Sequence, residues 1–213
     1  MIFLDIETDR LENPSKIHCI ACVEEDGSDR LFQDYSEFAR YIRKADKVVT
    51  HNGIHFDWPA ISNLIDPDCI PCTKVIDTLI LSRLHHFQME GGHSLENWGN
   101  ILDHPKIGLD INDWSQFTPE IGLRCLNDAR LTKKVYAVLS SILDRRKPSF
   151  DAAILVEHQM AFVCLGMQLD GIGFDAGRAS VLLADLQHRV SDLDKDLLNA
   201  LHPKASSAGV VVP

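Results

Sequence analysis

The spacing of hydrophobic and polar positions in the first half of the chain predicts short strands. A turn sequence, DGS at 26–28, separates the second from the third and indicates a hairpin. KVVTHN is a short buried strand, and KVIDTLILSRLHHF begins as a strand and continues as a helix. The five predicted strands cover 1–8, 17–24, 30–35, 47–52 and the start of the segment at 74.

Helical spacing dominates the rest of the chain, and polar residues mark where helices begin. The predicted helices are 37–45 after Ser36, 57–65, SLENWGNIL capped by Ser94, 119–144 after Thr118, 151–169, and 176–201 after Asp175. Strands joined as hairpins, followed by alternating strands and helices, predict a mixed α/β sheet. The helical C-terminal third is predicted to be an appendage, with domains at 1–147 and 148–213.

The first strand carries two carboxylates where apolar side chains are expected. Alternation places Asp5 and Glu7 on one face with Phe3, about 7 Å apart along the strand. Buried like charges repel each other and are costly to desolvate. The pair is therefore expected to have a compensating cation.

Two further aspartates occupy unusual positions. Asp128 lies on the apolar stripe of the long helix, where a buried salt bridge to Arg124 one turn earlier is the alternative explanation. Asp57 lies between the strand KVVTHN and the next helix, where an N-cap is the alternative. Together with Asp5 and Glu7, these residues could hold two divalent cations, since Mg²⁺ prefers carboxylate ligands.

Charge, targeting signals and cysteine spacing limit the classes of function that the chain could have. The 213 residues carry a net charge of −10, which disfavours a broad duplex-binding surface but permits a small site whose cations supply positive charge. No secretory signal or uninterrupted apolar run of membrane-spanning length is visible, so a reducing, cytoplasmic setting without a membrane is expected. The C-x-x-C pairs beginning at Cys19 and Cys69 could be ordinary thiols, a zinc site or, for CIPC, a redox motif. Strand alternation favours ordinary thiols.

Three segments resemble the exonuclease motifs of the DEDD superfamily, which has a ribonuclease H-like fold: DIET, HNGIHFDWPAI and CLNDARLT. IDTLILSRL, HSLENWG and NDARLTKKVY are similar to the proofreading domain of bacteriophage-type family A DNA polymerases, over residues 1 to about 145. The later helical segment resembles the connection to a polymerase thumb, and no palm or fingers sequence follows. The resemblance implies a mixed five-stranded sheet flanked by helices.

The resemblance also implies roles for individual residues. Asp5 would bridge two Mg²⁺ or Mn²⁺ ions, Glu7 and Asp128 would complete the shell of one, and Asp57 would hold the other. Four residues would contact the terminal nucleotides: Thr8, Leu11, Asn52 and Phe56. Their alternative roles are strand-end capping for the two polar residues and core packing for the two apolar ones.

One position departs from the family pattern. The family has a tyrosine four residues before the third-motif aspartate, or a histidine five before, whereas this chain has Arg124 and Leu123. Arginine stays protonated and is not a base, although it could bind the scissile phosphate.

The expected function is 3′–5′ exonuclease proofreading on single-stranded or frayed DNA 3′ ends. The expected partner is a polymerase domain in cis or on a separate chain, in the bacterial host cytoplasm if the chain is phage-encoded. The alternatives are a nuclease-weak scaffold of the same fold, favoured by Arg124, and an unrelated small-molecule enzyme, which would not explain the carboxylates.

Overall fold

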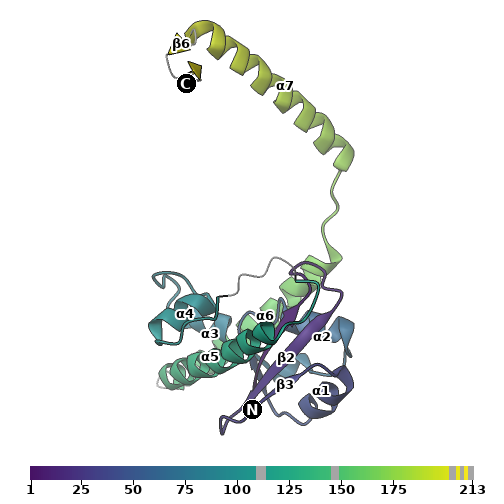
Figure 1. Ribbon diagram of the computed structural model, residues 1–213, viewed down its shortest axis with the longest axis vertical. Helices are drawn as coiled ribbons and strands as arrows, with labels where there is room; N and C mark the ends of the chain where they lie inside the picture. Colours follow the sequence, from purple (N-terminus) through teal and green to yellow (C-terminus); the bar gives the residue numbers. More distant parts are fainter. Residues whose placement is uncertain (109–113, 145–148, 202–204, 207–208, 211–213) are drawn as a thin grey trace. The chain divides into compact units, whose positions relative to one another are not determined.

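The computed structural model describes residues 1–108, 114–144, 149–201, 205–206 and 209–210 (Figure 1). The chain forms two compact units, Met1–Leu169 and Asp170–Pro213. The first unit contains the sheet and all of the predicted site residues.

A five-stranded mixed sheet forms the centre of the first unit, as predicted. Its order is β3-β2-β1-β4-β5, with antiparallel pairing of β1 to β2 and β2 to β3, and parallel pairing of β1 to β4 and β4 to β5. The strands are β1 (Ile2–Thr8), β2 (Ile17–Glu24), β3 (Asp29–Phe32), β4 (Val48–Thr50) and β5 (Val75–Asp77). Because β1, β4 and β5 run in parallel, their carboxyl ends meet at one edge of the sheet.

The helices follow the predicted ranges to within a few residues. They are α1 (Tyr35–Ile42), α2 (Asp57–Leu64), the short 3₁₀ helix η1 (Cys72–Lys74), α3 (Thr78–His85), α4 (Leu95–Ile101), α5 (Pro119–Asp144), α6 (Ser149–Asp170) and α7 (Ala176–Leu201). The predicted caps Ser94 and Asp175 accept hydrogen bonds from the first turns of α4 and α7. The prediction of Ser36 was wrong, because Asp34 caps α1 by accepting from the Glu37 N–H at 2.8 Å.

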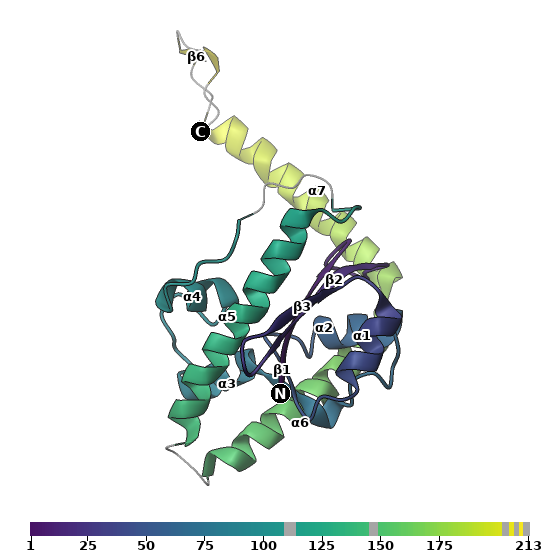
Figure 2. The same cartoon turned by 60° about the horizontal axis from the view of Figure 1, so that its bottom comes forward.

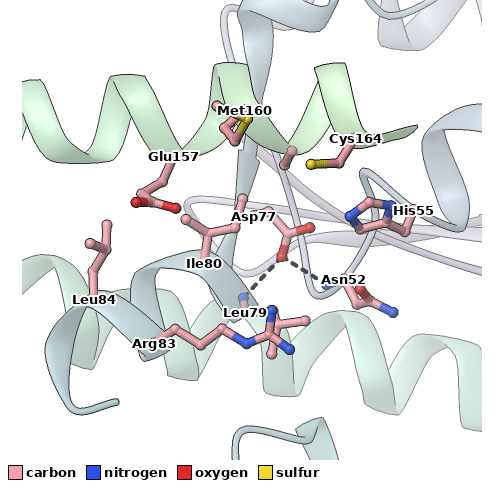
Figure 3. Close-up of a pocket in the computed structure, with 11 residues that line it drawn as sticks. Asn52, His55, Asp77, Leu79, Ile80, Arg83, Leu84, Glu157, Met160 and Cys164 are labelled. Carbon is pink, nitrogen blue, oxygen red and sulfur yellow. Dashed lines mark hydrogen bonds between the residues drawn. The ribbon is translucent and has the colours of Figure 1, made fainter. Parts of the chain in front are cut away.

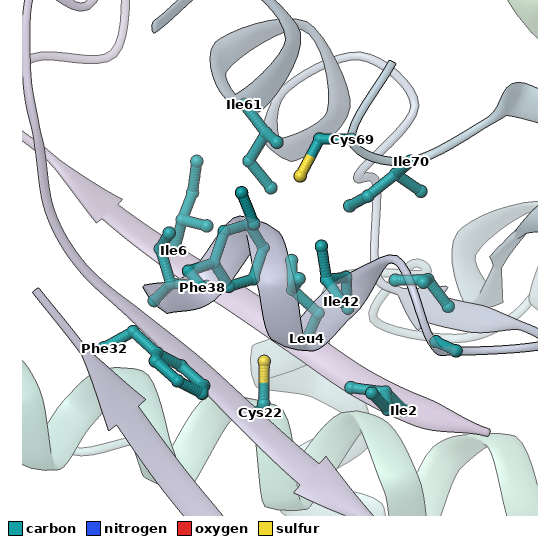
Figure 4. Close-up of a cluster of buried hydrophobic side chains, with 14 of the residues drawn as sticks. Ile2, Leu4, Ile6, Cys22, Phe32, Phe38, Ile42, Ile61, Cys69 and Ile70 are labelled. Atoms are coloured by element: carbon teal, nitrogen blue, oxygen red, sulfur yellow. The ribbon is translucent and has the colours of Figure 1, made fainter. Parts of the chain in front are cut away.

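Alternation along β1 and β2 separates two apolar cores on opposite faces of the sheet. Ile2, Leu4 and Ile6 pack with residues of α1 and α2 on one face (Figure 4). Phe3 packs with residues of α5 on the other face, and Figure 2 shows α5 lying along the sheet. Cys22 belongs to the first core and Cys19 to the second, so this C-x-x-C pair cannot chelate one zinc ion.

Helix α6 belongs to the same compact unit as the sheet. The Asp77 N–H donates to Nε2 of His158 at 2.8 Å, so Nδ1 of His158 carries the proton and donates to the Ile154 carbonyl at 2.7 Å. The ring of Phe162 meets that of Trp58 edge-on, with centroids 5.1 Å apart. The predicted domain boundary between 147 and 148 lies outside the described residues.

The outer surface of α6 is unusually apolar. By length and composition, Phe150–Asp170 is apolar enough to cross a membrane, although charged and polar residues interrupt its apolar sequence. Core helices of soluble proteins meet the same criterion, although little of this segment is buried. The buried hydrogen bond from the Asp77 N–H to His158 attaches α6 to the sheet domain.

The second unit contains α7 and two-residue strands, β6 (Ala205–Ser206) and β7 (Gly209–Val210), which pair antiparallel. No residue of α7 is buried. Its exposed stripe comprises Leu182, Leu186, Val190, Leu193, Leu197 and Leu201.

Candidate active site

Strand β1 and helix α5 bring three carboxylates together. Asp5 and Glu7 face α5, and Asp128 extends from the buried stripe of α5 with 2% of its surface exposed. One carboxylate oxygen from each of the three lies within 4.8 Å of the other two. Within the part of the chain that the structure describes, this is the only group of three or more acidic, histidine or cysteine side chains so arranged.

Local structure explains why Asp128 faces the sheet. Its stripe neighbours Cys125 and Thr132 are fully buried, and the Cys125 thiol donates to the Asp5 carbonyl at 3.3 Å. Helical periodicity then directs Asp128 toward the same strand. The predicted stripe is confirmed, and Asp128, its acidic member, lies beside Asp5 and Glu7 of β1.

Asp57 is the first residue of α2 and is 5% exposed. It occupies the first helical turn, while Phe56 holds the N-cap position, so the N-cap alternative is wrong. Asp57 lies outside the group of three, yet its charge contributes to the raised pKa of Asp5. Burial, and then the charge of Asp77, raises the pKa of Asp57 to about 8.

Burial and repulsion between neighbouring carboxylates raise the pKa values of Asp5 and Glu7. Burial is the largest cause of the raised pKa of Asp5, followed by the charges of Asp57, Asp128 and Glu7. Burial also raises the pKa of Glu7 to about 7, against the opposing effect of Arg124. A divalent cation would remove this penalty by favouring the charged forms.

Two basic side chains enter the carboxylate group. Lys106 Nζ lies 2.6 Å from Asp128 Oδ2. Arg124 Nε lies 3.0 Å from Glu7 Oε1 and 4.0 Å from Asp128 Oδ2, in ion pairs rather than an aligned hydrogen bond. The closer partner of Arg124 is therefore Glu7, whereas the alternative weighed from sequence was Asp128. The Arg124 guanidinium also lies over the Trp114 ring, 5.8 Å from its centroid.

The donor set suits Mg²⁺ or Mn²⁺. Both ions prefer carboxylate oxygens, and three residues supply them here. In addition, Oδ1 of Asp128 is buried and accepts no hydrogen bond from the described residues. A buried oxygen without a donor is a position that a cation could occupy.

The predicted nucleotide-contacting residues lie around this site with different exposures. Leu11 is 82% exposed, so its core-packing alternative is wrong, whereas Phe56 is half-buried against the core. Both line a cavity of about 540 Å³. Thr8 is buried and its hydroxyl donates to the Arg10 carbonyl, as strand-end capping predicts. Asn52 has φ 61° and is exposed.

Asn52 also borders a second cavity, of about 350 Å³, between α3 and α6 (Figure 3). The Asp77 carboxylate lines this cavity and accepts hydrogen bonds from the backbone N–H groups of Asn52, Ile54 and Leu79. Asp77 was not among the predicted site residues, although an aspartate at a strand-to-helix junction is a common N-cap signal. Lys106 was not predicted either, because it lies on no hydrophobic stripe and in no recognised motif.

The chain resembles ribonuclease H-like proteins in both sequence and fold. Residues 2–102, a little under half of the chain, match the RNase_H superfamily. Among solved structures, Brucella melitensis NrnC has a TM-score of 0.61 at 19% identity, covering 82% of this chain and 90% of that chain. Similar likenesses are found to NrnC with bound Mg²⁺, TM-score 0.59, and NrnC bound to pGG, TM-score 0.61.

The sequence is similar to that of phage DNA polymerases. It is 24% identical over 257 residues to the DNA-directed DNA polymerase of Escherichia phage T7 and 26% identical over 259 residues to that of Enterobacteria phage T3. Each alignment covers 92% of this chain and 36% of the polymerase. The chain thus spans about a third of the length of these relatives.

Proposed function

We propose that this chain is a divalent-metal-dependent exonuclease that removes nucleotides from single-stranded or frayed DNA 3′ ends. The convergence of Asp5, Glu7 and Asp128 within 4.8 Å carries the proposal, because a partly buried group of carboxylates is unfavourable unless cations bind it. The ribonuclease H-like fold and the similarity to phage DNA polymerases support it.

The proposed reaction is hydrolysis of the last phosphodiester bond. A water oxygen bonds to phosphorus, the bond from phosphorus to the 3′ oxygen breaks, and that oxygen takes up a proton as a nucleoside 5′-monophosphate leaves. Asp5, Glu7 and Asp128 would hold one of two ions, with Asp5 shared and Asp57 serving the second. Bound Mg²⁺ or Mn²⁺ would supply a nucleophilic hydroxide and stabilise the charge on the phosphate.

The remaining predicted residues would orient the strand. Leu11 and Phe56 line one cavity and could enclose the terminal base, while Asn52 and Thr8 could hydrogen-bond its sugar or phosphate. The net charge of −10 favours a substrate held at its end over a duplex bound along its length.

The proposed biological role is proofreading beside a polymerase, in the cytoplasm of a bacterial host if the chain is phage-encoded. The polymerases of phages T7 and T3 support this role, since the similarity covers most of this chain. The polymerase portion could be continuous with this chain or a separate subunit.

The decisive experiment follows a 5′-labelled single-stranded oligonucleotide incubated with the purified chain over a titration of Mg²⁺ and Mn²⁺. We expect a ladder shortening from the 3′ end that requires metal and is lost in Asp5→Ala. Asp196→Ala, at an exposed position of α7, is the matched control and should cleave like the parent. Metal-independent cleavage, or an active Asp5→Ala protein, would refute the proposal.

A second candidate is a nuclease-weak domain that serves as a scaffold for a polymerase. The ion pair between Arg124 and Glu7 favours it, because an arginine stands at the family's tyrosine position and engages a proposed ligand. A parent protein that binds Mn²⁺ in calorimetry but does not shorten the oligonucleotide would support this second function.

A further inference from the structure

Lys106 is the basic residue closest to the carboxylates, and the proposed metal sites give it no role. Its ammonium lies 2.6 Å from Asp128 Oδ2, and its side chain is 26% exposed, so it reaches the site from the solvent side. Its positive charge also opposes the raised pKa of Asp5 and of Glu7. One ammonium group therefore acts on three proposed metal ligands.

The backbone before Lys106 is fastened to the helix that carries Asp128. Asn127 accepts a hydrogen bond from His104 Nε2 at 2.9 Å and donates through Nδ2 to the Pro105 carbonyl at 3.2 Å. The His104 N–H also donates to the Gly99 carbonyl at 2.8 Å. These bonds fix the base of Lys106, while its four-carbon stem leaves the ammonium free to change partners.

A metal ion and the ammonium would compete for the same oxygen. An ion bound to Asp128 Oδ2 sits about 2 Å from it, within the space that a 2.6 Å ammonium contact uses, and carries charge of the same sign. Arg124 is less able to move, because it is paired with Glu7 and lies over Trp114. Lys106 is thus the cation that metal binding would release.

We propose that Lys106 is a tethered counter-ion that occupies Asp128 in the metal-free site and transfers to the terminal phosphodiester of the DNA strand when metal binds. The proposal rests on the proposed exonuclease function. Lysine suits the second step, because an ammonium binds phosphate as a mobile point charge. The DNA would then gain a positive contact in an otherwise acidic protein.

The test compares Lys106→Met with the parent in two binding measurements. Calorimetry with Mn²⁺ alone should give tighter binding, by about tenfold, since a competing positive charge within a few ångströms is removed. Fluorescence anisotropy in Mn²⁺, using an oligonucleotide with phosphorothioate linkages at its 3′ end, should give weaker DNA binding, by about tenfold. Lys106→Arg should restore DNA binding.

Lys134→Met is the matched control, because Lys134 is an exposed lysine of α5, and both constants should stay at the parent values. A purely structural role for Lys106 predicts weaker Mn²⁺ binding in Lys106→Met. Unchanged or weaker Mn²⁺ binding in a folded Lys106→Met protein would overturn the counter-ion role, and unchanged DNA binding would overturn the phosphate role. A parent that binds no Mn²⁺ would instead contradict the proposed function itself.

Discussion

Replacing Glu7 by glutamine should stabilise the metal-free protein at alkaline pH. Burial raises the pKa of Glu7 from 4.5 to about 7 in the folded state. A raised carboxyl pKa means that the folded state binds the proton more tightly, so stability is lost as pH rises from the unfolded pKa through the folded one. The difference corresponds to about 3 kcal/mol at pH 8, since one pKa unit is worth about 1.4 kcal/mol.

Glu7→Gln removes this ionisation and leaves the shape of the side chain unchanged. Because Arg124 loses its 3.0 Å partner, we expect a net gain of about 1–3 kcal/mol at pH 8 in chelator, or roughly 3–10 °C in the unfolding midpoint. At pH 4, where Glu7 of the parent is mostly protonated in both states, the gain should nearly vanish. Adding Mn²⁺ should stabilise the parent more than the variant, because a ligand of the ion has been removed.

Thermal unfolding followed by circular dichroism gives the unfolding midpoint of each protein under four conditions: pH 4 and pH 8, each with chelator or with Mn²⁺. Glu90→Gln, at an exposed glutamate, is the matched control and should unfold like the parent at both pH values. If metal-free Glu7→Gln is no more stable than the parent at pH 8, then the negative charge of Glu7 does not destabilise the metal-free fold. The electrostatic argument for a metal site would then be refuted.

Three further predictions concern rate, substrate and packing. Arg124→Tyr should raise the single-turnover cleavage rate by on the order of tenfold, because it supplies a water-orienting hydroxyl; a slower, folded and metal-bound variant would show that arginine is the working residue. Single-stranded oligonucleotides should be digested faster than blunt duplexes at the same salt concentration, because the net charge of −10 disfavours binding along a duplex. Equal rates would contradict this. His158→Ala should lower the free energy of unfolding, measured in urea, by about 1–3 kcal/mol, because it leaves the Asp77 N–H unpaired. His188→Ala, at an exposed position, is the control and should have little effect. If His158→Ala leaves the free energy of unfolding unchanged, α6 is held without this bond.

The sequence could predict the parts of the site whose side-chain directions follow from the periodicity of a single strand or helix. Alternation along β1 placed Asp5 and Glu7 on one face, and the stripe of α5 placed Asp128 toward the core; both placements hold in the structure. The same alternation separated Cys19 from Cys22. These predictions succeed because strand and helix geometry fix the direction of a side chain without knowledge of distant contacts.

The parts that the sequence could not predict depend on how loops fold back. Lys106 reaches Asp128 because the Asn127 side chain donates to the carbonyl of Pro105, the residue before Lys106. No periodic pattern in the sequence predicts this contact. Asp34 and Ser36 are both favourable N-cap types, and the chain path selects Asp34. Leucine is usually a core residue, but Leu11 lies exposed on the surface and lines a cavity.

The contact of Cys125 with the Asp5 carbonyl joins residues 120 positions apart, and this distance has a consequence for synthesis of the protein. A nascent chain displays Asp5 and Glu7 from the beginning, but it cannot complete the carboxylate group until α5 has left the ribosome. Closing so long a loop also makes the site one of the slower features to form, since such contacts require prior loss of chain entropy. Chains truncated before α5 should therefore lack the group of three carboxylates and the metal binding proposed for it.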